Sequence, residues 1–231
     1  MYSSFHLFLH EQILLLALRD KEGTIDMNIN CEYPIAGAII AELLLNHRIK
    51  IDESKKRKLA DLIDSTPLGD PVLDECLEKV KKMKKRASLE TLVTLFSSVK
   101  NLKHRLAQQL CRRGILKADE DTLLFIFKRK IYPEINPEPE RELIEKLRGA
   151  IFTDNSDIDA KTVVLISLAQ SFNLLQIVFD KKEIKQRKAR IRQLINGEIT
   201  GKVTKEAMEA MEAAILVSCI MPAIIATTVT S

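Results

Sequence analysis

The chain has 231 residues, and 36 Lys and Arg stand against 32 Asp and Glu, which gives a formal net charge of +4. This surplus is too small to indicate nucleic-acid binding by itself. The four cysteines form no CxxC pair and the chain begins without a signal-type core and cleavage site, so we expect no disulfide framework and a reducing, cytoplasmic location.

The opening of the chain predicts two consecutive helices. Apolar residues from Ile13 to Leu18 recur at helical spacing, and Gly23 follows as a residue that stops a helix. Pro34 opens the next helix, which is apolar nearly all round up to Leu44 and is therefore expected at the centre of the domain. With only 7 Gly and no linker, we predict a mainly α fold, a single globular helical domain over residues 1–231 with a few short β-hairpins.

The middle of the chain alternates between short strands and helices. Residues 48–52 and 58–63 are expected to pair as a hairpin, followed by a helix from Val72 to about Lys85. The Lys and Arg run at the end of that helix is interpreted as a solvated helix end. Two more helices are predicted at 89–96 and 102–112.

A second hairpin is predicted over residues 115–128, with strands at 115–117 and 122–128 and a turn at 118–121. Its apolar run would need cover on both faces and consists of Leu123, Leu124, Phe125, Ile126 and Phe127. Two interpretations stay open: the hairpin packs on the domain, or it meets another protein.

The last third of the chain predicts helices at 140–152, 159–179 and 181–196. The final segment, 213–229, is almost wholly apolar. Because Ser218 and Pro222 interrupt it and it is short for a bilayer span, we interpret it as a buried core helix.

The sequence contains no enzymatic constellation. It has no P-loop, no GxGxxG after a strand and no GxSxG elbow. His6 and His10 are four residues apart, but no third metal ligand of matching spacing is nearby. We therefore expect no catalytic residues, no metal and no cofactor.

A basic segment offers the best candidate binding site. Lys100 and Lys103 lie one helical turn apart, so their ammonium groups can converge on one multiply charged anion such as a phosphorylated lipid headgroup. Arg105 is assigned to the same site. The alternative is an ordinary solvated helix face.

Several blocks in order resemble the Golgi phosphoprotein 3-like (GPP34) family. They are LLLALRDKEG at 14–23, AELLLNHRI at 41–49, GDPVLDECL at 69–77, VKNLKHRLAQQLCRRGIL at 99–116 and LLFIF at 123–127, with a weaker echo at 165–175. The resemblance covers most of the chain.

The resemblance implies a non-catalytic peripheral membrane adaptor that binds phosphatidylinositol 4-phosphate and the cytosolic tails of membrane proteins, and no nucleic acid. Two family arginines that hold the lipid phosphate fall on Lys100 and Lys103. The family's tryptophan is absent from the loop TIDMNIN, and Ala36 stands where the family has a further pocket arginine. The hairpin at 115–128 corresponds to a family element for self-association and membrane contact.

The expected location is cytoplasmic and peripheral on the cytosolic face of a membrane, the Golgi in a eukaryote. The degenerate lipid pocket and the absent amino-terminal arm look more like a prokaryotic member. Two alternatives remain. A winged-helix nucleic-acid binder would use the helix at 102–113 and the following hairpin, whereas an enzyme with an unrecognised site would need a deep pocket with convergent polar groups.

Overall fold

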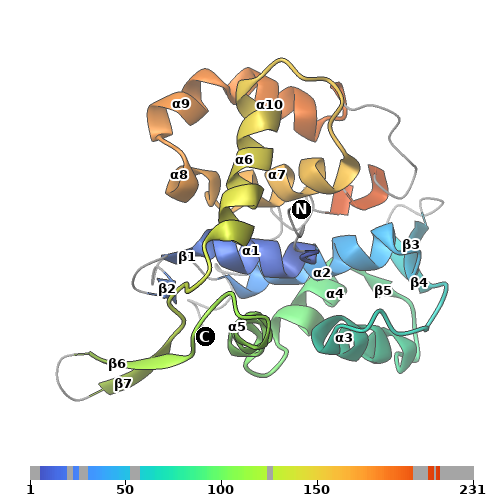
Figure 1. Ribbon diagram of the computed structural model, residues 1–231. Helices are drawn as coiled ribbons and strands as arrows, with labels where there is room; N and C mark the ends of the chain where they lie inside the picture. Colours follow the sequence, from blue (N-terminus) through green and yellow to red (C-terminus); the bar gives the residue numbers. More distant parts are fainter. Residues whose placement is uncertain are drawn as a thin grey trace, which may run out of the picture.

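The computed structural model describes residues 6–19, 23–25, 31–52, 58–123, 127–199, 208–210 and 212–213. The described part is mainly helical with small antiparallel sheets, as the sequence predicts (Figure 1). Its elements are α1 (Leu9–Ala17), β1 (Leu18–Arg19), β2 (Thr24–Ile25), α2 (Glu32–Leu45), β3 (Ile49–Asp52), β4 (Leu59–Leu62), α3 (Pro71–Lys81), β5 (Ala87–Ser88), α4 (Leu89–Ser97), α5 (Leu102–Arg112), β6 (Asp119–Leu123), β7 (Phe127–Ile131), α6 (Glu138–Phe152), α7 (Ala160–Ser171), α8 (Leu175–Val178), α9 (Lys181–Gln186) and α10 (Lys188–Ile195).

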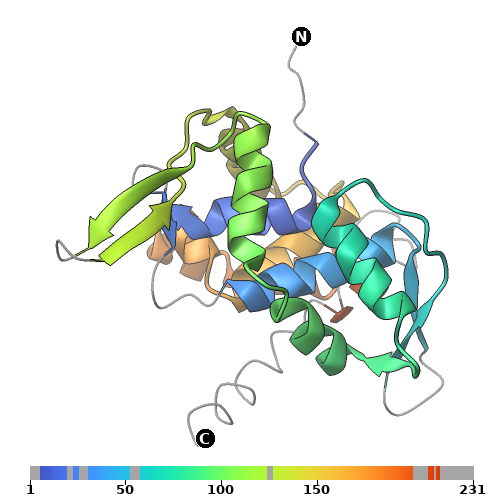
Figure 2. The ribbon, with the colours of Figure 1, turned by 90° about the horizontal axis from the view of Figure 1, so that it is seen from below.

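The helices form three layers. Helices α1 and α2 pack side by side as the middle layer, and α3, α4 and α5 lie against one side of it (Figure 2). Helices α6 and α7 cover the opposite side, α8 lies at the end of α7 and also contacts α1, and α9 and α10 lie above α7, next to the upper end of α6 (Figure 1). We call the layer of α3, α4 and α5 the lower layer. We call the layer of α6 to α10 the upper layer.

Helix α2 is the centre of the core, as its all-round apolar sequence predicts. Ile35, Ile39 and Leu43 are completely buried, and so are the small residues Ala36 and Ala38. Burying one such aliphatic side chain stabilises the fold by about 1.5–3 kcal/mol, so a helix buried on every side contributes strongly although it lacks an amphipathic face.

The first predicted hairpin is confirmed and has one additional strand. Strand β3 pairs antiparallel with β4, and β4 also pairs with the two-residue strand β5 that precedes α4. Arg86 lies next to β5 and bonds to carboxylates on both other strands, with its Nη2 atom 2.7 Å from Asp52 Oδ2 and from Asp61 Oδ2. This short sheet closes the end of the molecule beside α3.

The second hairpin is present, but its predicted strand boundaries are wrong. The structure pairs β6 with β7 over residues 119–131, so the predicted turn at 118–121 lies largely within a strand. The reason is cross-strand charge pairing: Asp121 stands opposite Arg129, with Oδ2 and Nη2 2.6 Å apart. The hairpin extends from the body on the side away from β3 and β4 (Figures 1 and 2). Leu124, Phe125 and Ile126 lie outside the described residues, as do the side chains of Leu123 and Phe127.

The upper layer is more broken than predicted. The expected helix 159–179 is divided into α7 and α8 at Asn173, whose φ is +60°. The expected helix 181–196 is divided into α9 and α10 at Arg187. Across the residues that the structure describes, no helix has both the length and the apolarity needed to cross a membrane. Of the predicted core segment 213–229, only Ala213 is described, and it is buried.

Candidate anion-binding site at the start of helix α5

The candidate site lies where α4 turns into α5. Val99 is buried and anchors the connection, and Asn101 adopts a left-handed φ of +57° that reverses the chain in a short space. Lys100 lies between them with an exposed side chain, immediately before the first turn of α5. The sharp turn therefore places Lys100 and Lys103 at the same end of one helix.

The three predicted site residues do not all point to one place. Lys103 reaches the start of α2, where its Nζ atom lies 3.7 Å from Glu32 Oε1. Arg105 turns to α3 and forms an ion pair with Glu75, whose pKa is lowered: burial would raise it, but Arg105 and then Lys79 outweigh burial. The structure thus keeps Lys100 and Lys103 at the candidate site, whereas Arg105 joins α5 to α3.

A histidine on α5, His104, lies next to Lys103 and can also change its protonation state. The His104 Nδ1 atom lies 3.2 Å from the Tyr132 hydroxyl, just after β7. Burial, and then the charges of Lys103 and Lys130, lower the pKa of His104 below its ordinary value of 6.5. His104 is therefore mainly uncharged at neutral pH, and the positive charge of this end of α5 comes from lysines.

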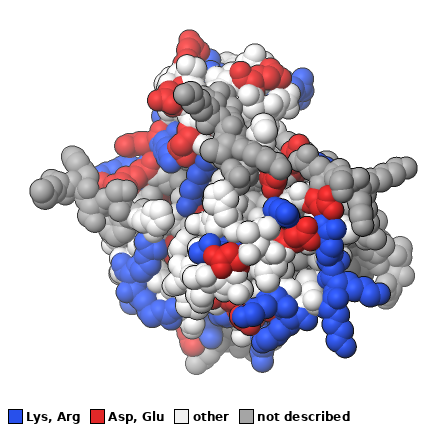
Figure 3. Space-filling model, turned by 90° about the vertical axis from the view of Figure 1, so that its right-hand side faces the viewer, with Lys and Arg blue, Asp and Glu red and all other residues white. Residues whose placement is uncertain are grey.

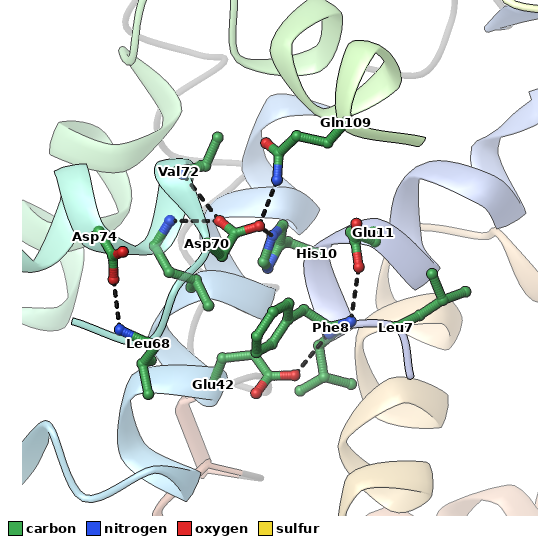
Figure 4. A network of polar contacts seen from close by, with 12 residues as sticks. Leu7, Phe8, His10, Glu11, Glu42, Leu68, Asp70, Val72, Asp74 and Gln109 are labelled. Carbon is green, nitrogen blue, oxygen red and sulfur yellow. Dashed lines mark hydrogen bonds and ion pairs between the residues drawn. The ribbon is translucent and has the colours of Figure 1, made fainter. Parts of the chain in front are cut away.

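A buried polar network holds α5 against α1 and α3 (Figure 4). Asp70 caps α3 by accepting hydrogen bonds from the amides of Val72 and Leu73, at 2.9 and 2.8 Å. Its other carboxylate oxygen accepts a hydrogen bond from Gln109 of α5 and lies 3.4 Å from His10 Nε2 of α1. One carboxylate therefore joins three helices that are far apart in the sequence.

Two buried carboxylates of the middle layer join it to the layers on either side. Arg113, directly after α5, donates from Nη1 to both Glu11 oxygens at 2.9 and 2.8 Å. On the opposite side, Lys161 of α7 lies 2.7 Å from Glu42 Oε1. Sequence reasoning missed these pairs. It also missed the network around Asp70, although the Asp-Pro step at the start of α3 is a common helix-capping pattern that could have indicated Asp70.

The end of α3 brings more exposed lysines to the lower layer. Lys81, Lys82, Lys84 and Lys85 are all exposed, whereas Arg86 is tied to the small sheet. Lys81, Lys84 and Lys85 border a surface hollow of about 260 Å³ that Val80 and Met83 also line. In the space-filling view of this end of the molecule, Lys and Arg side chains gather on the lower half (Figure 3). The run predicted as a solvated helix end is thus part of a basic surface.

Other reactive groups are poorly placed for chemistry. His10 is fully buried and stacks on Phe8, and among the described residues no His, Cys, Asp and Glu form a metal-binding group. Burial, followed by the charge of Glu32, raises the pKa of Cys31 to about 12, so its thiol stays protonated at neutral pH.

The sequence comparisons identify the family. A family model described as Golgi phosphoprotein 3 (GPP34) matches residues 9–211, and the chain belongs to this family. A vacuolar protein sorting-associated protein 74 from Eremothecium gossypii is 24% identical over 212 residues, which cover 78% of this chain and 64% of that protein. The chain thus spans less than two thirds of this relative's own length.

The geometry also bears on the two alternatives to an adaptor. A DNA recognition helix needs free side chains that reach base edges, but Arg105 and Arg113 are tied to Glu75 and Glu11. An enzyme needs convergent polar groups in a pocket, whereas the hollow beside α3 and a second one beside α9 and α10 are lined mainly by cations and apolar side chains. Neither alternative gains support from the described residues.

Proposed function

We propose that this chain is a non-catalytic peripheral membrane adaptor, whose lower layer binds anionic, phosphoinositide-type lipid headgroups. Lys100 and Lys103 contact the phosphate, and the exposed lysines after α3 add attraction to the surrounding anionic surface. The observation that carries the proposal is the pair of lysines presented at the start of α5, at the positions of the family's phosphate-binding arginines. The chain works at the cytosolic face of a membrane, the Golgi in a eukaryote, and engages cytosolic tails of membrane proteins.

The chemistry of the site favours attraction over selectivity. A lysine is a point charge without the planar fork with which arginine binds phosphate in two places. Glu32 lies next to Lys103 and competes with an incoming phosphate for its ammonium group. Without a tryptophan in the chain, binding lacks an aromatic wedge and is mainly electrostatic. We therefore expect affinity for several anionic headgroups rather than one.

Reversing both lysine charges tests the lipid site. The variant Lys100→Glu/Lys103→Glu should reduce binding to vesicles containing phosphatidylinositol 4-phosphate or phosphatidylserine by at least tenfold, because each cation near an anionic surface contributes about 1 kcal/mol. Co-sedimentation measures the bound fraction at low and physiological salt. Glu32→Gln should change binding in the opposite direction, because it frees Lys103 from its carboxylate neighbour.

The control is Lys182→Glu/Lys117→Glu, which changes the net charge equally at two exposed lysines away from the start of α5. It should reduce vesicle binding less than threefold. If the two double variants lost vesicle binding equally, only net charge would matter and the site would be contradicted. The site would also be contradicted if the wild type bound neutral phosphatidylcholine vesicles as strongly as anionic ones.

The hairpin is proposed to mediate self-association. Its stem is held by the ladder between β6 and β7 and by charge pairs such as Asp121 with Arg129, and it extends away from the body. We expect Leu124→Lys/Ile126→Lys to lower the mass measured by light scattering while the melting temperature stays within about 2 °C, because a projecting hairpin contributes little to the core. If unfolding accompanies the change in mass, the hairpin is instead part of the core.

A further inference from the structure

The upper layer contains a groove that the lipid site does not use. It lies between α9 and α10 on one side and the ends of α7 and α8 on the other, with a volume of about 360 Å³. Its floor is apolar: Ile184 and Ile191 are buried, and Ile195 is half-buried. Gln170 and Gln176 close the side next to α7 and α8.

The rim of the groove is formed by four cations. Lys181, Lys185, Lys188 and Arg192 line it with exposed side chains. Over the part of the chain that the structure describes, none of the four takes part in a salt bridge. Their neighbours on the same helices behave differently. Arg190 donates from Nε to the Ala150 carbonyl at 2.8 Å, which holds α10 against α6.

The basic residues of α9 and α10 and of the connection between them therefore have two different roles. Arg187 and Arg190 point toward α6 and satisfy backbone carbonyls, whereas the rim cations face a groove without any described counter-charge. The four rim positions recur after four, three and four residues, so they follow one side of α9 and α10. Lys181 and Lys185 form a pair on α9, Lys188 and Arg192 form a second pair on α10, and both pairs line the groove.

We propose that this groove binds an acidic amphipathic peptide segment of a partner protein, with apolar side chains on the isoleucine floor and carboxylates against the cationic rim. An apolar floor beside a row of cations that have no counter-charge among the described residues is complementary to a segment that carries both apolar and acidic groups. Two separate helices supply the cations, which favours a peptide, because one lipid headgroup would engage the pair on only one helix. The upper layer is also separated from α5 by the middle layer, so the groove stays accessible when the lower layer contacts a membrane (Figure 1).

Fluorescence anisotropy with synthetic peptides tests the groove on the full chain. The probe is a labelled 14-residue helix-forming peptide with leucines on one face and glutamates flanking them, and a matched peptide carries lysines in place of the glutamates. The glutamate peptide should bind and the lysine peptide should not. Lys185→Glu/Lys188→Glu should weaken binding at least tenfold, whereas the control Lys182→Glu/Lys117→Glu should weaken it less than twofold. Circular dichroism should show the same melting temperature for the groove variant and the control variant of the protein.

Three results would overturn the proposal. They are equal affinity for the glutamate and lysine peptides, equal weakening by the groove and control variants, and an absence of peptide binding by the wild-type chain. If the groove variant lowers the mass in light scattering, a second copy occupies the groove; if it abolishes vesicle binding, a lipid does. The proposal does not rest on the lipid site, and Lys100→Glu/Lys103→Glu keeps peptide binding even where vesicle binding is lost.

Discussion

Replacing Gly23 by alanine is expected to lower the free energy of unfolding by about 3–5 kcal/mol, which is more than most single substitutions do. A β-carbon at this position would lie 2.0 Å from the Pro133 nitrogen and 2.2 Å from the Tyr132 carbonyl carbon, so the backbone there must move. That movement would break the hydrogen bond from the Tyr132 amide to the Gly23 carbonyl, which measures 2.8 Å. Urea denaturation measures the loss.

Gly114→Ala is the matched control. Gly114 also has a positive φ, +71°, but a β-carbon there would meet nothing within 4 Å. Only the strain of a left-handed alanine remains, which is about 1–2 kcal/mol. A similar loss in the two variants would mean that backbone conformation, and not the close approach of residues 132 and 133, explains the need for glycine at position 23.

Asp70→Ala is expected to lower the free energy of unfolding by about 3–4 kcal/mol. The substitution removes the cap of α3, which is worth about 1 kcal/mol, and leaves His10 and Gln109 buried without their carboxylate partner. A buried polar group that loses its partner destabilises the fold by about 1–3 kcal/mol. Thermal and urea unfolding should both detect the effect.

The same carboxylate predicts the direction of acid sensitivity. Burial would raise the pKa of Asp70, but His10, the Leu73 amide and Gln109 outweigh burial and lower the pKa from 3.8 to about 2. Because the folded pKa is below the unfolded one, the stabilisation is present above about pH 4 and is lost as the pH falls through about 2. The shift corresponds to roughly 2 kcal/mol. The difference in stability between wild type and Asp70→Asn should therefore shrink between pH 5 and pH 2.

Asp159→Ala provides the comparison with a half-exposed cap, whose other partners are the Thr162 hydroxyl and Lys146 in a surface ion pair of little energetic weight. Asp159 caps α7 by accepting from the Thr162 amide at 3.0 Å, but its side chain is 52% exposed. Its removal should lower stability by about 1 kcal/mol. If both aspartates gave this smaller loss, the contacts of Asp70 with His10 and Gln109 would contribute nothing beyond the cap.

The helices of the core were predictable because their apolar spacing is a local property. Helix α2 and helix α5 lie where the sequence predicts them, and the pairing of β3 with β4 follows from two neighbouring alternating segments. The β6–β7 register was not predictable from turn propensity, because Asp121 and Glu120 look like turn residues until Arg129 and Lys130 stand opposite them.

The candidate site was predictable only in part. Lys100 and Lys103 are close in the sequence, so helical spacing places them together, but the destination of Arg105 depends on Glu75, thirty residues away. The network of His10, Asp70 and Gln109 combines residues from three separate helices, and no periodic pattern marks such a contact. The groove beside α9 and α10 was not predictable from the sequence for the same reason, because its walls come from separate segments.

The two carboxylates that join the middle layer to its neighbours also determine how stiff the binding surfaces are. Glu11 and Glu42 are both about 2% exposed, and each meets its cation from a different outer layer. Parting either outer layer from the middle one would break one of these ion pairs and expose the apolar side chains that the two layers bury between them, which is unfavourable. Layer opening is therefore rare, and the lysines on α5 and α9 are carried on a rigid frame. Binding at these surfaces orders side chains but little backbone, so little conformational entropy is lost on association.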